Sequence, residues 1–363
     1  MLRHTPRLPE NDMERPIMKP IGTPAEELDT PSLVVELSAL ESNINHFHSR
    51  FLDSQCPKLR PHLQSHLSPA IAHMQLRAPG TVGGAAVSTL GQAEIFAQHG
   101  IDDILITNLV VTASKVSRAA ALAKRIGLTI GADSRRNISD LGTAATSAGS
   151  EIAVLIVVRG ETDFLGVSPG DVPALAGIVS DTAGLSFAGL MSSNSGSLLD
   201  ALSNCTDEGI EAPSAALTLD EIKNTPASLA GITEVIAGSY ALMDAANLAA
   251  MSELRPAARI LTTVMTHQDE GLVWLDAGQK ATSIDTGLPL VDGISGATVS
   301  RMSAEHGGMV LEAGASWDID LGSKVWLIPH NIANTVNVYD FIHATRDGKL
   351  EAVWEVAARG RYD

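Results

Sequence analysis

From residue 31 to about residue 251, short apolar runs alternate with longer amphipathic stretches, and this alternation leaves few folds open to the chain. Runs of period two, typical of strands, give way to runs of period 3.6, typical of helices. Strands are predicted at residues 32–36, 59–64, 82–87, 103–107, 128–132, 152–158, 187–191 and 233–236. Helices are predicted between them, at residues 37–50, 69–76, 90–98, 112–125, 135–147 and 170–181. Eight strands in this order predict an α/β fold with a (β/α)8 TIM-like barrel.

A second, β-rich domain is predicted after Pro256, where the helical pattern fades. Strand-like runs separated by Gly and Asp follow, at residues 259–265, 272–276, 309–312, 324–328, 336–341 and 350–356. Short strands at such intervals are typical of an antiparallel barrel or sandwich. We therefore expect three parts, with boundaries at 1–28 for a proline-rich N-terminal arm, 29–255 for the barrel and 256–363 for a C-terminal antiparallel β domain. The arm is either a mobile tail or a segment held against a partner subunit.

The charge and cysteine content exclude several classes of partner and compartment. The chain has 42 acidic and 25 basic residues, for a net charge of -17, and such a field repels phosphate backbones, so we expect no nucleic-acid partner. The most apolar runs, 152–158 and 254–264, are too short or too interrupted by charge to cross a membrane. Cys56 and Cys205 have no metal-site spacing and are too few for a disulfide framework. No secretory pattern opens the chain, so a cytoplasmic location is expected.

Candidate reactive groups are sought at the carboxyl ends of the barrel strands, where the active sites of such barrels lie. Arg60, His62, Gln64 and His66 share strand parity, so all four face the mouth of the barrel if the strand continues regularly. The polar positions predicted at the mouth are Arg60, His62, Gln64, His66, Asn108, Asp133, Arg159, residues 192–197, Ser239 and Tyr240.

A family resemblance is carried by eight segments: 29–33 (DTPSL), 59–69 (LRPHLQSHLSP), 90–94 (LGQAE), 100–106 (GIDDILI), 233–240 (TEVIAGSY), 275–285 (LDAGQKATSID), 305–307 (EHG) and 329–340 (PHNIANTVNVYD). In this order they resemble the D-threonine aldolase and D-serine dehydratase family, a fold-type III pyridoxal-phosphate group related to alanine racemase. The resemblance implies an N-terminal barrel, a C-terminal β domain, a small-molecule substrate and a homodimer with active sites near the subunit interface. It also implies pyridoxal phosphate as cofactor.

The sequence departs from this family at the position that holds the cofactor. In the family the strand-two segment reads Arg-Pro-His-x-Lys-Thr-His, and its lysine forms a Schiff base with pyridoxal phosphate. Here that position is Gln64, whose amide is neither basic nor nucleophilic. The resemblance therefore implies a member that does not use the cofactor through this residue.

Further departures concern the groups around the cofactor and the family's metal site. The ring-supporting arginine is replaced by Phe164 and Leu165, the Tyr-x-Gly-His pattern by residues 193–197, the glycine-rich phosphate loop by residues 212–218, and the two metal ligands by Asn331 and Ala333. His330 is one residue from a ligand position, and we expect it to point to the opposite face of a strand.

Ten residues remain as candidates for chemistry or binding. An imidazole moves protons near neutral pH, a guanidinium binds carboxylates, and an acid next to an imidazole is a usable acid–base pair. The predicted catalytic residues are His62, His66, Glu305 and His306, and the predicted substrate-binding residues are Arg60, Gln64, Arg159, Ser239, Tyr240 and Asp285.

Several functions stay open at this point. One is an enzyme of lyase, aldolase or isomerase type that acts on a small polar carboxylate without a lysine aldimine, by histidine acid–base or metal-assisted chemistry. Another is a non-catalytic homologue that binds a ligand or a partner subunit. A third retains pyridoxal phosphate through another lysine. A divalent metal held by His62 and His66 with an acidic third ligand is also open.

Overall fold

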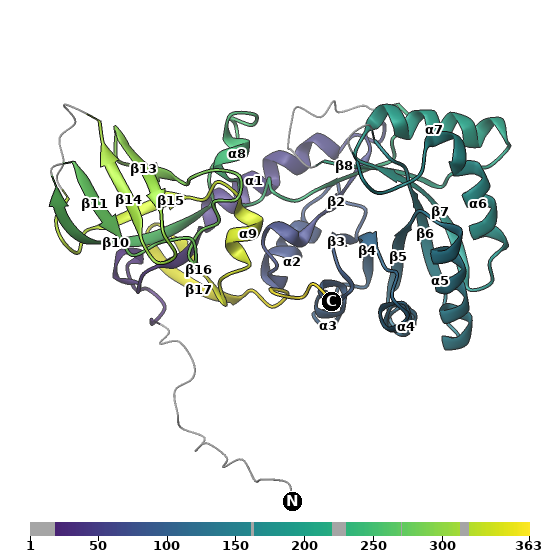
Figure 1. Cartoon of the computed structure of the whole chain (residues 1–363), viewed down its shortest axis with the longest axis horizontal. Coiled ribbons are helices and arrows are strands. Elements are labelled where there is room, and N and C mark those ends of the chain that lie inside the picture. Colours follow the sequence, from purple (N-terminus) through teal and green to yellow (C-terminus); the bar gives the residue numbers. More distant parts are fainter. Residues whose placement is uncertain (1–18, 161–162, 220–229, 270, 313–318) are drawn as a thin grey trace, which may run out of the picture.

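The computed structural model describes residues 19–160, 163–219, 230–269, 271–312 and 319–363 (Figure 1). In this part of the chain, eight parallel strands form one sheet in the order β2, β9, β8, β7, β6, β5, β4, β3. Isolated bridges between Leu59 and Thr81 and between His62 and Ala86 bring β2 alongside the other end of the sheet. The sheet is therefore a nearly closed barrel, which confirms the predicted fold class. The strands are β2 (Lys58–Pro61), β3 (Ala85–Val87), β4 (Asp103–Leu109), β5 (Gly127–Ala132), β6 (Ile152–Val157), β7 (Leu185–Ser192), β8 (Ser214–Thr218) and β9 (Glu234–Ala237).

Helices cover the outside of the barrel, and most begin at a capping residue that the sequence supplies. The side chains of Thr89, Thr112, Ser134 and Asn194 accept hydrogen bonds from backbone amides at the starts of α3, α4, α5 and α7. No helix within the described ranges is long and apolar enough to cross a membrane. The helices are α1 (Leu37–His48), α2 (Pro69–Arg77), α3 (Leu90–Gln98), α4 (Ala113–Leu122), α5 (Arg135–Ala148), α6 (Val172–Asp181), α7 (Ser195–Asp207), α8 (Ala245–Leu248) and α9 (Ile332–Val336).

One predicted barrel strand belongs to the other sheet. Strand β1 (Ser32–Glu36) pairs antiparallel with β10 and parallel with β16, so it lies in the middle of the second sheet. Its place in the barrel is taken by β8 (Ser214–Thr218), a segment that the sequence analysis did not predict as a strand. β1 is buried almost throughout, and a strand covered on both faces has the same continuous apolar pattern in either sheet.

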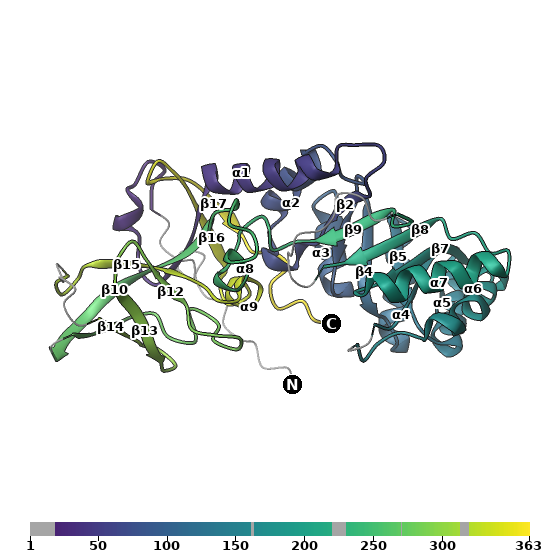
Figure 2. The same cartoon turned by 90° about the horizontal axis from the view of Figure 1, so that it is seen from above.

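The second sheet has the strand order β13, β14, β11, β10, β1, β16, β17, with β15 paired to β10 and β12. Its neighbouring strands are antiparallel except for the β1–β16 pair, which confirms the antiparallel β domain. Figures 1 and 2 show this sheet beside the barrel, with α1, α8 and α9 between the two. The strands are β10 (Ala258–Asp269), β11 (Leu272–Leu275), β12 (Leu290–Asp292), β13 (Ala297–Met302), β14 (Gly307–Leu311), β15 (Lys324–Ile328), β16 (Phe341–Arg346) and β17 (Lys349–Glu355).

The strand predicted at residues 336–341 is wrong. Helix α9 occupies Ile332–Val336, and the next strand begins only at Phe341. The helix starts where it does because the Asn331 side chain accepts a hydrogen bond from the Asn334 amide at 3.2 Å. An asparagine cap of this kind favours a helical turn over an extended segment.

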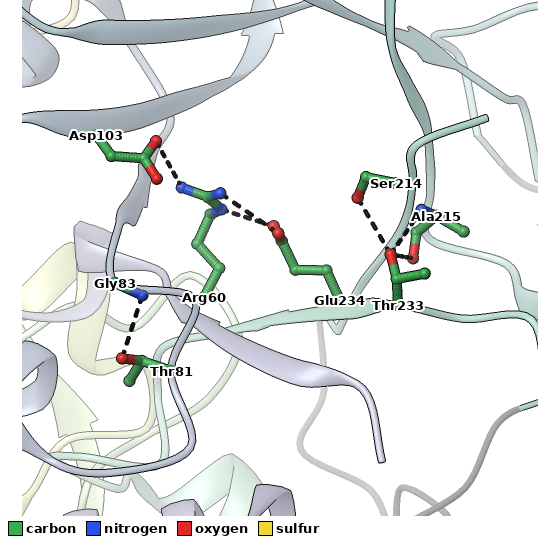
Figure 3. A network of polar contacts seen from close by, with 8 residues as sticks. All are labelled: Arg60, Thr81, Gly83, Asp103, Ser214, Ala215, Thr233 and Glu234. Atoms are coloured by element: carbon green, nitrogen blue, oxygen red, sulfur yellow. Dashed lines mark hydrogen bonds and ion pairs between the residues drawn. The ribbon is translucent and has the colours of Figure 1, made fainter. Parts of the chain in front are cut away.

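A buried ion-pair cluster lies at the amino-terminal end of the barrel (Figure 3). Arg60 donates from Nε to Glu234 Oε1 at 2.6 Å and from Nη2 to Glu234 Oε2 at 3.3 Å. Its Nη1 donates to Asp103 Oδ1 at 3.1 Å. Glu234 and Asp103 are the first residues of β9 and β4, so the guanidinium lies at the end opposite the mouth. The expectation that Arg60 faces the mouth is therefore wrong, because two carboxylates hold its side chain at the other end.

Arg60→Ala is expected to lower the free energy of unfolding by about 3–5 kcal/mol, because the buried Glu234 carboxylate then lacks its counter-ion. Asp103→Asn is the matched control. The Asp103 side chain is 46% exposed, so its loss of charge is expected to cost about 1 kcal/mol or less. Urea unfolding followed by circular dichroism measures both variants. A loss for Arg60→Ala no larger than that for Asp103→Asn would contradict the role of this cluster.

Candidate functional site

The main cavity, of about 900 Å³, lies at the carboxyl ends of the barrel strands and is completed by the C-terminal domain. Most polar groups on its wall are hydroxyls and amides of Ser, Thr, Asn and Gln. No lysine or arginine lines it among the residues that the structure describes. Its titratable lining residues, within the same ranges, are His62, Asp163, Asp244, His330 and Tyr362. Proton transfer at this wall therefore falls to two imidazoles, two carboxylates and a phenol.

His62 lines the cavity directly after the end of β2, as predicted. Its Nδ1 accepts a hydrogen bond from the Gln64 backbone amide at 3.3 Å, so in the neutral ring the proton is on Nε2. Nε2 lies 3.4 Å from Thr107 Oγ1, and the Thr107 hydroxyl donates to the Val87 carbonyl. Burial lowers the pKa of His62 to about 4, so the ring is neutral at pH 7.

Gln64 and Ser239 also lie at the mouth, as predicted, and both line the cavity. The Gln64 Oε1 atom accepts a hydrogen bond from the Ser88 hydroxyl at 2.7 Å. That contact joins the segment after β2 to the residue that precedes the cap of α3. Gln64 therefore presents an amide, held by a neighbouring hydroxyl, at the place where the sequence analysis expected a mouth residue.

His66 and Tyr240, both expected at the mouth, lie behind the cavity wall in a buried hydrogen-bond network. The strand ends at Pro61 and residues 63–65 form a 3-10 turn, so strand alternation does not extend to His66. His66 Nδ1 accepts from the Ser68 amide at 3.1 Å, and its Nε2 donates to Gln75 Oε1 at 2.9 Å. Gln75 Nε2 donates to the Tyr240 hydroxyl oxygen at 2.9 Å. Both ring nitrogens of His66 are thus occupied by the protein.

The network continues from Tyr240 to His48, which the sequence analysis did not single out. His48 Nδ1 lies 3.1 Å from the Pro79 carbonyl, an oxygen that only accepts, so this nitrogen carries the proton. Nε2 then accepts from the Tyr240 hydroxyl at 2.8 Å. Burial lowers the pKa of both His48 and His66 to about 4 and raises the pKa of Tyr240 above its usual range. Every member is neutral at pH 7, and we assign the network a structural role.

Other predicted residues lie away from the main cavity. Arg159 is exposed and does not line it. Glu305 and His306 lie in the exposed turn between β13 and β14, where Glu305 forms an ion pair with Lys280. This turn packs on the backbone near Gly278, where an added Cβ would lie 2.5 Å from the Glu305 carbonyl carbon. The described fold therefore does not bring the Glu305–His306 pair together with His62.

Asp285 lines a smaller neighbouring cavity and acts on the main one through Asn331. Its Oδ2 accepts from Asn331 Nδ2 at 3.1 Å and from Asn334 Nδ2 at 2.8 Å. A hydrogen bond from Ser283, and then those from the two asparagines, hold the pKa of Asp285 below its usual value. Asn331 itself lines the main cavity, so Asp285 is a positioning residue rather than a contact for a ligand there.

His330 lines the main cavity, contrary to the expectation that it points away. β15 ends at Ile328, so strand alternation no longer sets its direction. Its Nδ1 lies 2.9 Å from Thr286 Oγ1, and a Cβ at Gly287 would be 2.5 Å from its ring. The sequence signal that could have found His330 is Gly287, a residue without a side chain where the ring needs room.

Asp244 is a second cavity residue that the sequence analysis missed, and it joins the two domains. Its Oδ1 accepts from the Asn247 amide and side chain, and its Oδ2 accepts from the Ile332 amide at 3.1 Å. The Ala245 amide also donates to the Pro329 carbonyl at 2.9 Å. These contacts fix residues 329–332, and with them His330, against the barrel.

The described residues contain no group of three His, Cys, Asp or Glu side chains that could hold a metal ion. His62 and His66, the pair for which a metal was considered, each direct Nδ1 at a backbone amide. A metal ligand must leave a nitrogen lone pair free, and in neutral His66 the other nitrogen donates to Gln75. This pair is therefore not arranged as a metal site.

Comparisons with known proteins agree on one family. A model described as the alanine racemase N-terminal domain matches residues 35–258, and one described as a putative serine dehydratase domain matches residues 257–345. D-threonine aldolase of Arthrobacter sp. is 33% identical over 365 residues, covering 93% of this chain and 95% of that protein. A 3-hydroxy-D-aspartate aldolase of Paracoccus denitrificans is 30% identical over 370 residues, covering 94% of each. The crystal structure of D-threonine aldolase from Filomicrobium marinum matches with a TM-score of 0.86 at 31% identity, over 94% of this chain and 99% of that one.

The stability of the protein is expected to fall as the pH drops from about 6.5 to about 4. The pKa of His48 and of His66 is lower in the folded chain than in the unfolded chain, so the unfolded chain takes up protons first. The contribution of each histidine to the free energy of unfolding is fully present above pH 6.5, and up to about 3 kcal/mol of it per histidine is lost by pH 4. Melting temperatures between pH 7.5 and 4.5 measure this dependence. We expect a smaller loss between these pH values in His66→Gln and no change of slope in the surface control His46→Gln; equal slopes in all three proteins would contradict the assignment.

Proposed function

The chain belongs to the protein family described as alanine racemase, N-terminal domain, and on that premise we propose that it is a lyase-type enzyme acting on a small β-hydroxy carboxylate. Two full-length relatives, a D-threonine aldolase and a 3-hydroxy-D-aspartate aldolase, support this reaction class. The observation that carries the proposal is that the neutral imidazole of His62 lines the main cavity at the carboxyl end of β2. The Nε2–H of this neutral imidazole is a hydrogen-bond donor for a substrate oxygen, while its Nδ1 lone pair accepts from the Gln64 backbone amide.

Two proton transfers are needed for this class of reaction. Aldol cleavage takes a proton from the β-hydroxyl and returns one to the carbon that keeps the electron pair, and dehydration takes a proton from carbon and gives one to the leaving hydroxyl. His62 from the barrel and His330 from the C-terminal domain are the imidazoles available in the described lining. We infer that His330 removes the proton and, as an imidazolium, returns it, and that His62 donates a hydrogen bond from Nε2 to the substrate oxygen. Hydroxyl and amide groups such as Ser239 and Asn108 would bind the carboxylate.

The described lining does not fit pyridoxal phosphate as the family resemblance would have it bound. The cofactor needs an amine for its Schiff base, and the expected position is Gln64, whose amide is bonded to Ser88. No lysine or arginine lines the cavity in the described ranges, so no side-chain cation is present there for the phosphate. Phe164, at the position of the ring-supporting arginine, is 98% exposed. We therefore propose chemistry without a lysine aldimine and derive no step through the cofactor.

A non-catalytic ligand-binding role is the second candidate, and one observation favours it. The two cavity carboxylates are already bonded within the protein: Asp163 accepts from the Gly160 amide and the Ser193 hydroxyl, and Asp244 accepts from the Ile332 amide. A wall of satisfied neutral groups suits reversible binding as well as turnover. The homodimer and the cytoplasmic location stay predictions.

Turnover is tested by measuring the release of glycine and of ammonia from D-threonine and from 3-hydroxy-D-aspartate, since aldol cleavage of either compound yields glycine and dehydration yields a 2-oxo acid and ammonia. His62→Ala and His330→Ala are each expected to lower kcat/KM by 100-fold or more, the usual loss on removing a hydrogen-bond donor to the reacting oxygen or a general base. His46→Ala, at an exposed position on α1, is the matched control and is expected to stay within twofold of the wild type. Full activity in both cavity variants would overturn their roles, and release of neither glycine nor ammonia by the wild type would favour the ligand-binding role.

Loss of the Schiff-base position is tested by reduction with borohydride in the presence of pyridoxal phosphate. The wild type is expected to acquire no label in the cavity, because a glutamine amide does not form the adduct. Gln64→Lys is expected to be labelled at residue 64, and Gln55→Lys, on the surface, is the control for non-specific labelling. Mass spectrometry of tryptic peptides locates the label. Stoichiometric labelling of a single lysine in the wild type would instead support the reading in which another lysine holds the cofactor.

A further inference from the structure

We propose that residues 356–363, called here the strap, hold Tyr362 at the rim of the main cavity, and that Tyr362 is a specificity-determining residue of the site. The strap leaves the C-terminal domain after β17 and runs to the start of α3 on the barrel, a path that can be followed in yellow in Figures 1 and 2. The docking of the strap stands on its own contacts. The effect of Tyr362 on substrates rests on the proposed function.

The first half of the strap is anchored to the segment that carries His62. The Ala358 amide donates to the Leu67 carbonyl at 3.1 Å, and Ala358 is fully buried. Leu67 has a φ of 51°, a left-handed conformation that is unfavourable for a leucine and is held here by its surroundings. The Gly360 amide donates to Asn337 Oδ1 at 2.8 Å. The strap therefore supports the turn that follows His62 while it is itself fixed to the C-terminal domain.

The second half of the strap is fixed to the first turn of α3. The Thr89 hydroxyl donates to the Arg361 carbonyl, and the Gly91 amide donates to the Asp363 carbonyl at 2.8 Å. A Cβ at Gly91 would lie 2.7 Å from Asp363 Oδ1 and 3.1 Å from the Asp363 backbone oxygen, so a larger residue here displaces the Asp363 carboxylate and crowds the strap backbone. A carboxylate at a helix N-terminus also interacts favourably with the helix dipole.

An ion pair completes the docking. Asp363 Oδ2 lies 3.2 Å from Arg118 Nη1, and Arg118 is oriented by two hydrogen bonds to Glu94, at 2.9 and 2.6 Å. The Lys115 ammonium is 3.4 Å from the Tyr362 carbonyl. Residues 361, 362 and 363 thus each have a partner on the barrel, from α3, its cap or α4.

Tyr362 has a fixed backbone and a free ring. Its neighbours on both sides are bonded to the barrel, yet 58% of the residue is exposed and it lines the main cavity together with Ser88 and Thr89. A ring held this way contacts whatever enters without losing backbone freedom on binding. Contacts far from the reacting atoms change KM more than kcat, because they are the same in the ground state and the transition state.

The test of docking needs no substrate. Hydrogen exchange followed by mass spectrometry is measured on the full chain for wild type, Gly91→Ala and Gly177→Ala. Gly177 is a helical glycine in α6 with open space around it, so its substitution controls for the added methyl group. Gly91→Ala is expected to speed exchange at least tenfold in the peptides that contain residues 89–92 and 356–363, and Gly177→Ala is expected to leave both unchanged. Unchanged exchange in Gly91→Ala would contradict the proposed docking of the strap on α3.

The test of specificity uses the same variants with D-threonine and 3-hydroxy-D-aspartate. Tyr362→Ala is expected to raise KM about tenfold for at least one of the two compounds and to leave kcat within twofold. Gly91→Ala is expected to reproduce this effect, and the double variant to add nothing to it, because both changes remove the same ring from the rim. Unaltered KM in Tyr362→Ala overturns its role. Faster exchange in Gly91→Ala with no turnover in the wild type supports the strap and overturns the proposed function alone.

Discussion

The arrangement of the site depends on the buried hydrogen-bond network from Ser68 through His66, Gln75 and Tyr240 to His48. It joins four separate pieces of the chain, namely the turn after β2, helix α2, the segment after β9 and helix α1. Each donor has one acceptor, and the Pro79 carbonyl at one end and the Ser68 amide at the other fix the direction of every hydrogen. A fully satisfied network of this kind specifies one arrangement of the segments it joins. The turn after β2 is therefore rigid where it carries His62 and Gln64.

The same rigidity decides which histidine is available for chemistry. His66 and His62 are four residues apart and both are neutral at pH 7. Both ring nitrogens of His66 are hydrogen-bonded within the protein, and His66 does not line the cavity. Both ring nitrogens of His62 form only weak hydrogen bonds, because their contacts of 3.3 and 3.4 Å are long. A substrate hydroxyl could replace Thr107 as partner of His62 at little cost. The buried network holds the turn, and the less tightly bonded imidazole of His62 at its edge lines the cavity.

The local pattern of the sequence was sufficient where a single segment decides the structure. Helix α3 has the predicted bounds because Thr89 caps its start and its apolar positions repeat with helical spacing. The pattern was insufficient where a distant partner decides. The apolar run at β1 suits either sheet, and β10 and β16 select it. Arg60 and His330 are two further residues whose positions the local pattern did not predict. Strand parity predicted a mouth position for Arg60, but Glu234 holds its guanidinium at the other end. Parity also directed His330 away from the cavity, although the strand had already ended.

Among the described residues, the cavity wall offers a ligand hydrogen bonds rather than a cationic side chain. In the described lining the imidazole of His62 is neutral, the carboxylates of Asp163 and Asp244 are bonded to backbone amides, and no lysine or arginine is present. Neutral hydrogen bonds gain little in contact with water, because water offers the same bonds. They become selective only where water is excluded and the local dielectric is low. Tyr362, on a backbone that the barrel holds in place, is 58% exposed at this rim, so its ring displaces water only where a bound substrate contacts it. On the proposed function, the cavity wall thus supplies weak, directional contacts, and the strap adds a ring contact at the rim that makes them discriminate by covering part of the substrate.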